Sequence, residues 1–324
     1  MRQTVRTLAL ALIASLFAGA FAQDIVLRAA DNQPDDYPTV QGLYFMADYI
    51  EAATDGRIVM EVFSGGQLGD ERSTIEQVQL GVIDVVRTST SPVGEFYEPI
   101  GVFSLPYIFR GETHMWKVVN GPIGRELLDG LQESDLVGLA YYDSGSRNFY
   151  TTETPIREVA DLEGLRMRTQ QSQVVLDMME ALGAEPVPMA FAEVYSSLQT
   201  GVIDGAENNF PSYGPFGVRH YEVAPYFTLD GHARVPEVVM ISKSTWDRLS
   251  AEDQMIVREA ALASVTVQAA LWDDLSNESR DAVVAAGSEI INVDVAEFQA
   301  AMGPVYEKYG AAYGDLVDRI LAVE

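Results

Sequence analysis

Two arginines follow short strand-like segments, where they could bind an acidic ligand. Arg147 comes after the apolar segment 137–142, and Arg168 ends the segment 165–168 just before a helix-like region. Open α/β sheets bind ligands at the carboxyl ends of their strands. An arginine there presents a planar fork of N–H donors that matches a carboxylate. Recognition of an organic acid is one interpretation of these two residues, and a surface salt bridge is the other.

A segment rich in amides and aromatic rings lies further along the chain. It carries Asn208 and Asn209, followed closely by Phe210 and Tyr213. Such a mixture suits a polar ligand with one flat apolar face, such as a sugar ring. Asn and Pro also favour turns, so an ordered turn is the alternative interpretation.

Catalytic and metal-binding patterns are missing from the sequence. There is no cysteine, and His114, His220 and His232 do not have metal-ligand spacing. The glycine-rich segment 65–69 lacks the Lys and Ser/Thr of a phosphate-binding loop. A secreted enzyme acting on a sugar acid, with Glu71 as one of two carboxylates, is kept as a second function class, although no second carboxylate can be named. We expect no catalytic residue, no metal and no cofactor.

The elements that must position these residues indicate an α/β protein with two similar lobes. Segments 25–30 and 58–63 are predicted strands around a helix that begins at Pro38. The tetrapeptide GVID occurs at 81–84 and again at 201–204, each time after a helix-like segment. Its glycine is expected to end the helix, and its Val-Ile pair to begin a buried strand. The repeat predicts two lobes of related topology.

A long helix is predicted near the C-terminus. Segment 251–286 contains neither Pro nor Gly, Ser250 with Asp253 resembles a capping box, and Gly287 is a stop signal. At 1.5 Å per residue such a helix would extend about 54 Å. It therefore either crosses both lobes or breaks near Asp273.

Composition and the N-terminus indicate an exported protein. The chain has 21 Lys and Arg against 48 Asp and Glu, a formal net charge of −27, which argues against nucleic-acid binding. Arg2 and Arg6 precede an apolar segment at 8–21, and Ala20 and Ala22 form a small-residue cleavage site. We predict a signal peptide over 1–22, cleavage before Gln23, and no later membrane-spanning segment.

Several longer motifs resemble one family of proteins. The motifs are GQLGDE at 66–71, SLPY at 104–107, DLEGLRMR at 161–168, PMAFAEVY at 188–195 and LQTGVIDGAEN at 198–208. In these motifs the chain resembles the DctP-type solute-binding proteins of tripartite ATP-independent periplasmic (TRAP) transporters. The resemblance covers essentially the whole mature chain.

This resemblance implies an architecture, a location and a partner. The fold would be an α/β periplasmic binding protein with mixed sheets flanked by helices, hinge strands and a long helix spanning both lobes. Lobe I would comprise 23–145 plus 233–272, and lobe II 146–232 plus 273–324. The protein would be a monomer in the periplasm that delivers an organic acid to membrane permease subunits.

The resemblance also implies a set of ligand-binding residues. Arg168 would clamp the ligand carboxylate, Arg147 would be a second arginine in the cleft, Phe191 would pack on the ligand and Asn208 would hydrogen-bond it. The remaining expected contacts are Glu71 from the first lobe, Asn32 and Gln33 after the first strand, and His232 near the hinge.

The ligand is expected to be a sugar acid. Segments 208–213, 220–224, 231–232 and 236–238 resemble the branch that binds hexuronates such as D-glucuronate and D-galacturonate. The chain departs from that branch at Phe210, where a Trp is expected, and at 214–217. A C4-dicarboxylate or another organic acid is the alternative ligand.

Overall fold

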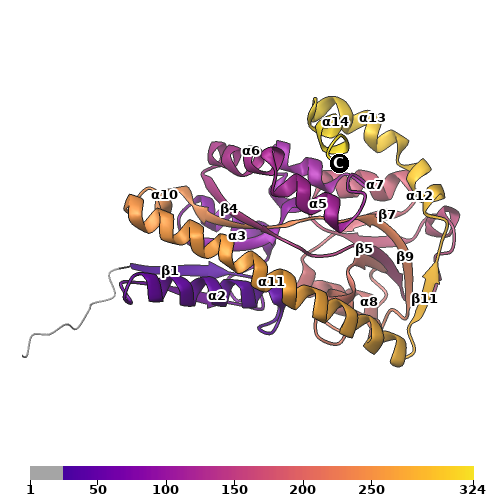
Figure 1. The fold of residues 1–324 in the computed structure, drawn as a ribbon. Helices are drawn as coiled ribbons and strands as arrows, with labels where there is room; N and C mark the ends of the chain where they lie inside the picture. The colour runs from indigo at the N-terminus through magenta and orange to yellow at the C-terminus, as the bar shows by residue number, and fades with distance from the viewer. Residues whose placement is uncertain (1–24) are drawn as a thin grey trace, which may run out of the picture.

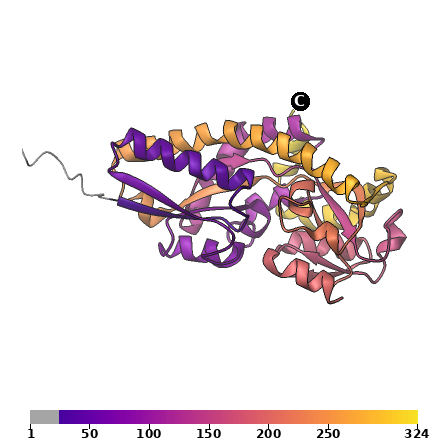
Figure 2. The same cartoon turned by 90° about the horizontal axis from the view of Figure 1, so that it is seen from below.

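The computed structural model describes residues 25–324, which form two lobes, each built on one β-sheet (Figures 1 and 2). The expected signal peptide and its cleavage site before Gln23 lie outside the described residues. The first sheet has five strands in the order β2-β1-β3-β10-β4, and the second has six in the order β11-β9-β5-β8-β6-β7. Both sheets mix parallel and antiparallel pairs, as the expected fold class requires.

The first sheet begins with the predicted strand-helix-strand unit. Its strands are β1 (Ile25–Ala30), β2 (Ile58–Phe63), β3 (Val85–Ser89), β4 (Leu136–Tyr142) and β10 (Glu237–Ser242). Its helices are α2 (Pro38–Ala53), α3 (Glu71–Gln79), α4 (Thr90–Val93), α5 (Glu112–Val119), α6 (Pro122–Gly130) and α10 (Lys243–Trp246). Helix α2 starts with a proline at its first position and buries Leu43, Met46 and Ile50, which lie on one helical face.

The second sheet carries the later part of the chain. Its strands are β5 (Arg147–Thr151), β6 (Arg166–Thr169), β7 (Glu185–Pro188), β8 (Gly205–Asn208), β9 (Tyr226–Ala233) and β11 (Glu289–Asn292). Helices α7 (Gln173–Ala181), α8 (Val194–Gln199) and α9 (Phe210–Tyr213) connect them, and short 3-10 turns lie at Phe191–Glu193 and His220–Glu222. Strands β6, β7 and β8 run parallel, so their carboxyl ends meet at one edge.

Three segments join the two sheets. The chain passes from β4 to β5 through residues 143–146 and returns from β9 to β10 through 234–236. The third is α11 (Ala251–Ala285), 35 residues long and unbroken, which contacts α2 and β4 at one end and α9 at the other (Figure 2). Ser250 caps it by accepting a hydrogen bond from the backbone of Asp253, as predicted. The predicted helix therefore crosses both lobes without a break.

The sequence was expected to contain no membrane-spanning segment after the signal peptide. Helix α11 differs from this expectation, because by length and composition alone it could cross a membrane. Part of its apolar surface is buried, with Val257, Ala260 and Ala261 in the core of the first lobe. The buried polar residues Ser264 and Gln268 bond to Tyr142 and to the backbone of Asp143 at the end of β4. These contacts place α11 as a brace over the lobes.

The two copies of the GVID repeat form equivalent turns. Gly81 and Gly201 both have a φ of +69°, which a residue without a Cβ adopts at no steric cost. The expectation that each Val-Ile pair begins a strand was wrong. Val82 and Val202 are 49% and 52% exposed, and the strands begin only at Val85 and Gly205. The aspartate of each copy instead fastens the turn, since Asp84 and Asp204 accept hydrogen bonds from the backbone of the neighbouring strand, β1 or β6.

The C-terminal helices lead from the second lobe back to the first (Figure 1). Helix α12 (Val295–Ala301) packs on β9, and α13 (Gly303–Ala312) contacts α7, where Lys308 and Tyr309 reach Asp177. Helix α14 (Leu316–Leu321) packs on α6, and the Ile320 carbonyl is 3.0 Å from Nε2 of His114 in α5. The last turns of the chain thus rest on the first lobe.

Candidate functional site

A cavity of about 380 Å³ lies between the two sheets. Both lobes contribute equally to its lining. From the first lobe come Asn32, Gln33, Tyr37, Thr39, Glu71, Arg87 and Glu237. From the second come Arg147, Arg168, Gln170, Phe191, Asn208, Asn209 and Ser212, and Ser144 of the connecting segment completes the set. The cavity lies at the carboxyl ends of parallel strands in both sheets, where α/β proteins bind ligands.

Arg168 is a buried cation near the carboxyl end of β6. Its side chain is only 2% exposed, yet it forms no ion pair with any acidic residue between 25 and 324. Its Nε and Nη2 donate hydrogen bonds to the Met189 carbonyl at 3.2 and 3.0 Å, and the Phe191 ring centroid lies 5.8 Å from its guanidinium carbon. Burial lowers the pKa of Arg168, because the charged form is poorly solvated there. The remaining guanidinium donors can pair with an anion in the cavity.

Arg147 lies beside the same cavity but is already paired. It is the first residue of β5, and it makes a two-pronged ion pair with Glu207, including Nη2 to Oε1 at 2.8 Å. Burial would raise the pKa of Glu207, but Arg147 and His232 outweigh it and lower that pKa to about 2. Glu207 therefore holds Arg147 rigidly and offsets most of its charge.

His232 was expected to contact the ligand, and the structure places it elsewhere. It does not line the cavity but lies behind Glu207, with Nε2 3.4 Å from Glu207 Oε2 and Nδ1 2.7 Å from Asp230 Oδ2. Its ring stacks on Phe149 at a centroid distance of 4.5 Å. Burial alone would lower the pKa of His232, but the two carboxylates raise it to about 9. The histidine thus supports Glu207 from behind, held between that carboxylate and Asp230.

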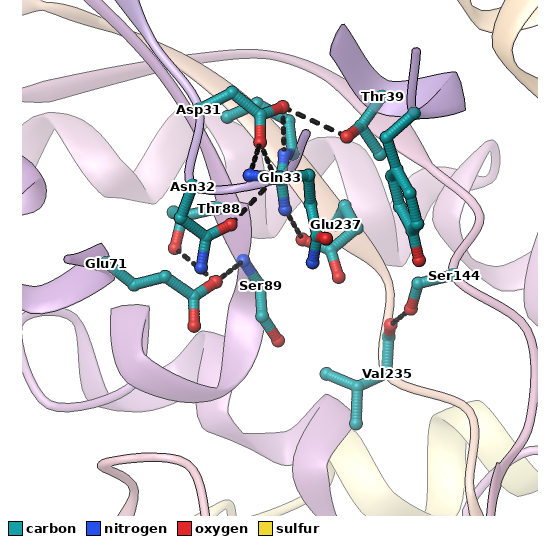
Figure 3. Close-up of polar contacts among 12 residues, drawn as sticks. Asp31, Asn32, Gln33, Thr39, Glu71, Thr88, Ser89, Ser144, Val235 and Glu237 are labelled. Carbon is teal, nitrogen blue, oxygen red and sulfur yellow. Dashed lines mark hydrogen bonds and ion pairs between the residues drawn. The ribbon is translucent and has the colours of Figure 1, made fainter. Parts of the chain in front are cut away.

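The first lobe presents an acidic wall to the cavity (Figure 3). Glu71 Oε1 accepts hydrogen bonds from the Ser89 amide at 2.9 Å and the Thr88 hydroxyl at 3.1 Å. Arg87, in β3, is shared by two carboxylates: it ion-pairs with Asp31 and donates from Nη1 to Glu237 Oε2 at 2.8 Å. Arg87 and Glu237 were not predicted to contribute to the site.

The other predicted residues lie where they can contact a ligand. Asn32 Oδ1 accepts from Arg87 Nη2 at 3.0 Å, and Gln33 Oε1 is buried without a hydrogen-bond partner in the described chain. Asn208 ends β8, and its Oδ1 accepts from the Asn209 amide at 2.9 Å. Phe191 forms part of the cavity lining beside Arg168. Seven of the eight predicted residues therefore surround one cavity.

Contacts across the cavity show that the lobes are closed. The Tyr37 hydroxyl of the first lobe is 2.8 Å from Ser212 Oγ of the second. At the rim, the backbone amide of Gln173, the first residue of α7, donates to Glu95 Oε1 at 2.7 Å. Glu95 thus caps helix α7 of the opposite lobe. The N-cap residue of that helix, Ser172, forms no capping hydrogen bond with its own side chain. These contacts must break when the lobes separate.

The arrangement is suited to binding. A buried cation faces acceptor and amide groups around a polar cavity, and Phe191 offers one apolar surface. No group of three or more His, Asp or Glu residues that could hold a metal ion occurs in residues 25–324. The site therefore matches a small organic acid that carries several hydroxyl groups.

Comparison with known proteins identifies the family. Residues 29–312 match the model of the bacterial extracellular solute-binding protein family 7, DctP. A curated solute-binding protein of Chromohalobacter salexigens is 35% identical over 97% of this chain and 94% of its own length.

Solved structures show the same similarity. A TRAP periplasmic solute-binding protein of Xanthobacter autotrophicus Py2 with bound β-D-galacturonate is 44% identical, with a TM-score of 0.89 over 92% of this chain and all of that chain. Another, from Pseudomonas putida F1 with bound D-glucuronate, is 42% identical, with a TM-score of 0.90 over 92% of this chain and 97% of that one. The chain belongs to the DctP family of extracellular solute-binding proteins, the binding components of TRAP transporters.

Proposed function

We propose that this protein captures a hexuronate, D-glucuronate or D-galacturonate, and delivers it to the membrane permease of a TRAP transporter. The observation that carries the proposal is Arg168, a buried arginine at the cavity without an acidic partner among residues 25–324. A ligand carboxylate would supply the missing charge through a bidentate pair. The bound ligands of the Xanthobacter and Pseudomonas proteins support the choice of a hexuronate.

The other lining residues would recognise the rest of the sugar acid. Hydroxyl groups both donate and accept hydrogen bonds, so they suit Glu71, Asn32 and Asn208, and Arg147 would add a further N–H donor near the carboxylate. Phe191 would cover an apolar face of the ring. His232 would act indirectly, by holding Glu207 and so Arg147.

Two alternatives receive less support. A C4-dicarboxylate would need a second cationic contact, but Arg87 and Arg147 are already paired with carboxylates. A hydrolytic enzyme would need an acid and a base placed around the scissile bond. Of the two glutamates that line the cavity, Glu237 is ion-paired with Arg87, and Glu71 is held by hydrogen bonds from Thr88 and Ser89. The protein is therefore proposed to be a binding protein and not an enzyme.

The proposed transport cycle depends on two lobes and on export. We propose lobe I as 23–145 plus 233–272 and lobe II as 146–232 plus 273–324, with the terminal helix α14 packed back onto lobe I. Removal of residues 1–22 would release a monomeric protein into the periplasm. Ligand would favour closure because only the closed lobes bring both walls to it.

Calorimetric titration tests the proposal. The purified protein is titrated with D-glucuronate, D-galacturonate and a C4-dicarboxylate such as succinate. Binding of a uronate, with no heat from the dicarboxylate, is the expected result. Tighter binding of the dicarboxylate would refute the hexuronate assignment, and turnover of a uronide during incubation would refute the non-enzymatic one.

A further inference from the structure

The cavity is electrically polarised from one lobe to the other. The second lobe contributes Arg168, which has no acidic partner among residues 25–324, and Arg147, which is paired with Glu207; the first contributes Glu71 and Glu237, with Arg87 as their one nearby cation. Figure 3 shows Glu71 and Glu237 in the same group of first-lobe side chains as Asn32 and Ser89. A ligand that spans the cavity therefore meets the uncompensated cation Arg168 at one end and carboxylates at the other.

Each of these glutamates has one oxygen held by the protein and one left for a ligand. Glu71 uses Oε1 for the Thr88 and Ser89 bonds, and its Oε2 has only a 3.4 Å contact with Gln170. Glu237 gives Oε2 to Arg87, and its Oε1 has no hydrogen bond within residues 25–324. A carboxylate oxygen only accepts hydrogen bonds, so both positions favour a ligand group that donates.

Negative charge on this wall is only partly compensated. Arg87 is shared between Asp31 and Glu237, and Glu71 has no cationic partner within ion-pair distance among the described residues. Burial, with a contribution from Glu71, raises the pKa of Glu237 to about 7 even though Arg87 opposes the rise. Glu237 is therefore fully ionised only well above neutral pH, and there the two carboxylates repel a second anion.

We propose that Glu237, together with Glu71, determines specificity by admitting sugar acids with a single carboxylate and rejecting sugar diacids. The inference rests on the proposed function, since it takes Arg168 to hold one carboxylate. The opposite end of the ligand then faces the two glutamates. A terminal hydroxyl there donates a hydrogen bond, whereas a second carboxylate cannot donate and meets like charges.

The test uses two ligands that differ only at that end. D-Gluconate and D-glucarate share one carbon chain, and glucarate has a carboxylate in place of the terminal hydroxymethyl group. Glucarate presents a carboxylate to the acidic wall in either orientation. Both acids and D-glucuronate are titrated calorimetrically into the wild-type protein, Glu237→Gln and Glu61→Gln. The last variant is a charge-matched control, because Glu61 is exposed on β2 and does not line the cavity.

We expect gluconate to bind the wild type at least about tenfold more tightly than glucarate, a difference of about 1.4 kcal/mol. This preference should shrink by about tenfold or more in Glu237→Gln and persist in Glu61→Gln. Two results overturn the inference and leave the proposed function intact. The wild type binds gluconate and glucarate with equal affinity, or it binds neither of them although it binds D-glucuronate. A wild type that binds none of the three acids refutes the proposed function itself.

The role of Glu237 is tested separately from that of the wall. A preference that persists in a folded Glu237→Gln overturns the assignment of specificity to this residue. If Glu237→Gln does not fold, Glu71→Gln replaces it, because that change leaves both ion pairs of Arg87 in place. An unchanged preference in Glu71→Gln would then overturn the inference.

Discussion

Replacing Arg168 with alanine should abolish most ligand binding without destabilising the empty protein. In the complex this arginine would pair with the ligand carboxylate inside a closed cavity, where it is 2% exposed. Breaking a buried ion pair by removing one partner costs about 3–5 kcal/mol. Since about 1.4 kcal/mol is tenfold in affinity, Arg168→Ala should weaken binding by about a hundredfold to a few thousandfold.

The empty protein should respond differently, because its Arg168 has no carboxylate partner in the described chain. The wild type carries a buried cation whose pKa is lowered by burial, and alanine removes that unfavourable charge. Only two hydrogen bonds to the Met189 carbonyl and the contact with Phe191 are lost. The melting temperature without ligand should therefore stay the same or rise.

Calorimetry and thermal melts of three variants check this reasoning. Arg168→Lys should recover only part of the affinity, because an ammonium cannot reproduce the planar fork. Arg157→Ala is the control, since Arg157 is 58% exposed in its ion pair with Glu289 and lies outside the cavity. If Arg168→Ala binds the ligand within about threefold of wild type, or about 0.7 kcal/mol, then Arg168 is not the residue that clamps the carboxylate. Unfolding of Arg168→Ala would make Arg168 a structural residue.

Three further expectations concern the surroundings of the cavity. Arg147→Ala should lower the free energy of unfolding by about 3–5 kcal/mol in urea titrations, because Glu207 is left buried without its main cation; an unchanged stability would contradict this. The pKa of His232 is raised from 6.5 to about 9 on folding, so its stabilisation is complete below pH 6.5 and is lost as the pH rises through 9. Denaturation between pH 6.5 and 9.5 should show this loss, and His232→Gln should remove it. Glu95→Gln should weaken ligand binding by up to about fivefold, since a charge at a helix N-terminus is worth about 0.3–1 kcal/mol and the contact with Gln173 exists only between closed lobes. An affinity equal to wild type would show that this contact does not favour closure.

Local patterns in the sequence were sufficient to predict much of the fold. The bounds of β1 and β2 agree with the structure, and α11 ends within one residue of its predicted end, because caps and periodicity are local signals. The GVID turns were misplaced by a few residues because their Val side chains are exposed rather than buried. Burial of a short apolar pair depends on the rest of the fold.

The acidic wall could not be predicted from the sequence for a physical reason. Arg87 lies in a short, otherwise unremarkable strand, and its partners Asp31 and Glu237 are 56 and 150 residues away. Such pairing follows from the order of strands in the sheet, which places β10 beside β3. The place of His232 behind Glu207 was not predictable for a related reason, because a position near the hinge does not reveal which side of Glu207 the ring occupies.

The most direct test of the central claim compares D-glucuronate with its uncharged amide, D-glucuronamide, in one calorimetric experiment. The two molecules share the ring and its hydroxyl groups, and they differ only in the group that would face Arg168. If the buried arginine recognises a carboxylate, D-glucuronate should bind and the amide should bind at least about a hundredfold more weakly, a difference of about 2.8 kcal/mol. Equal affinities for the two would contradict the claim that a carboxylate pairs with Arg168.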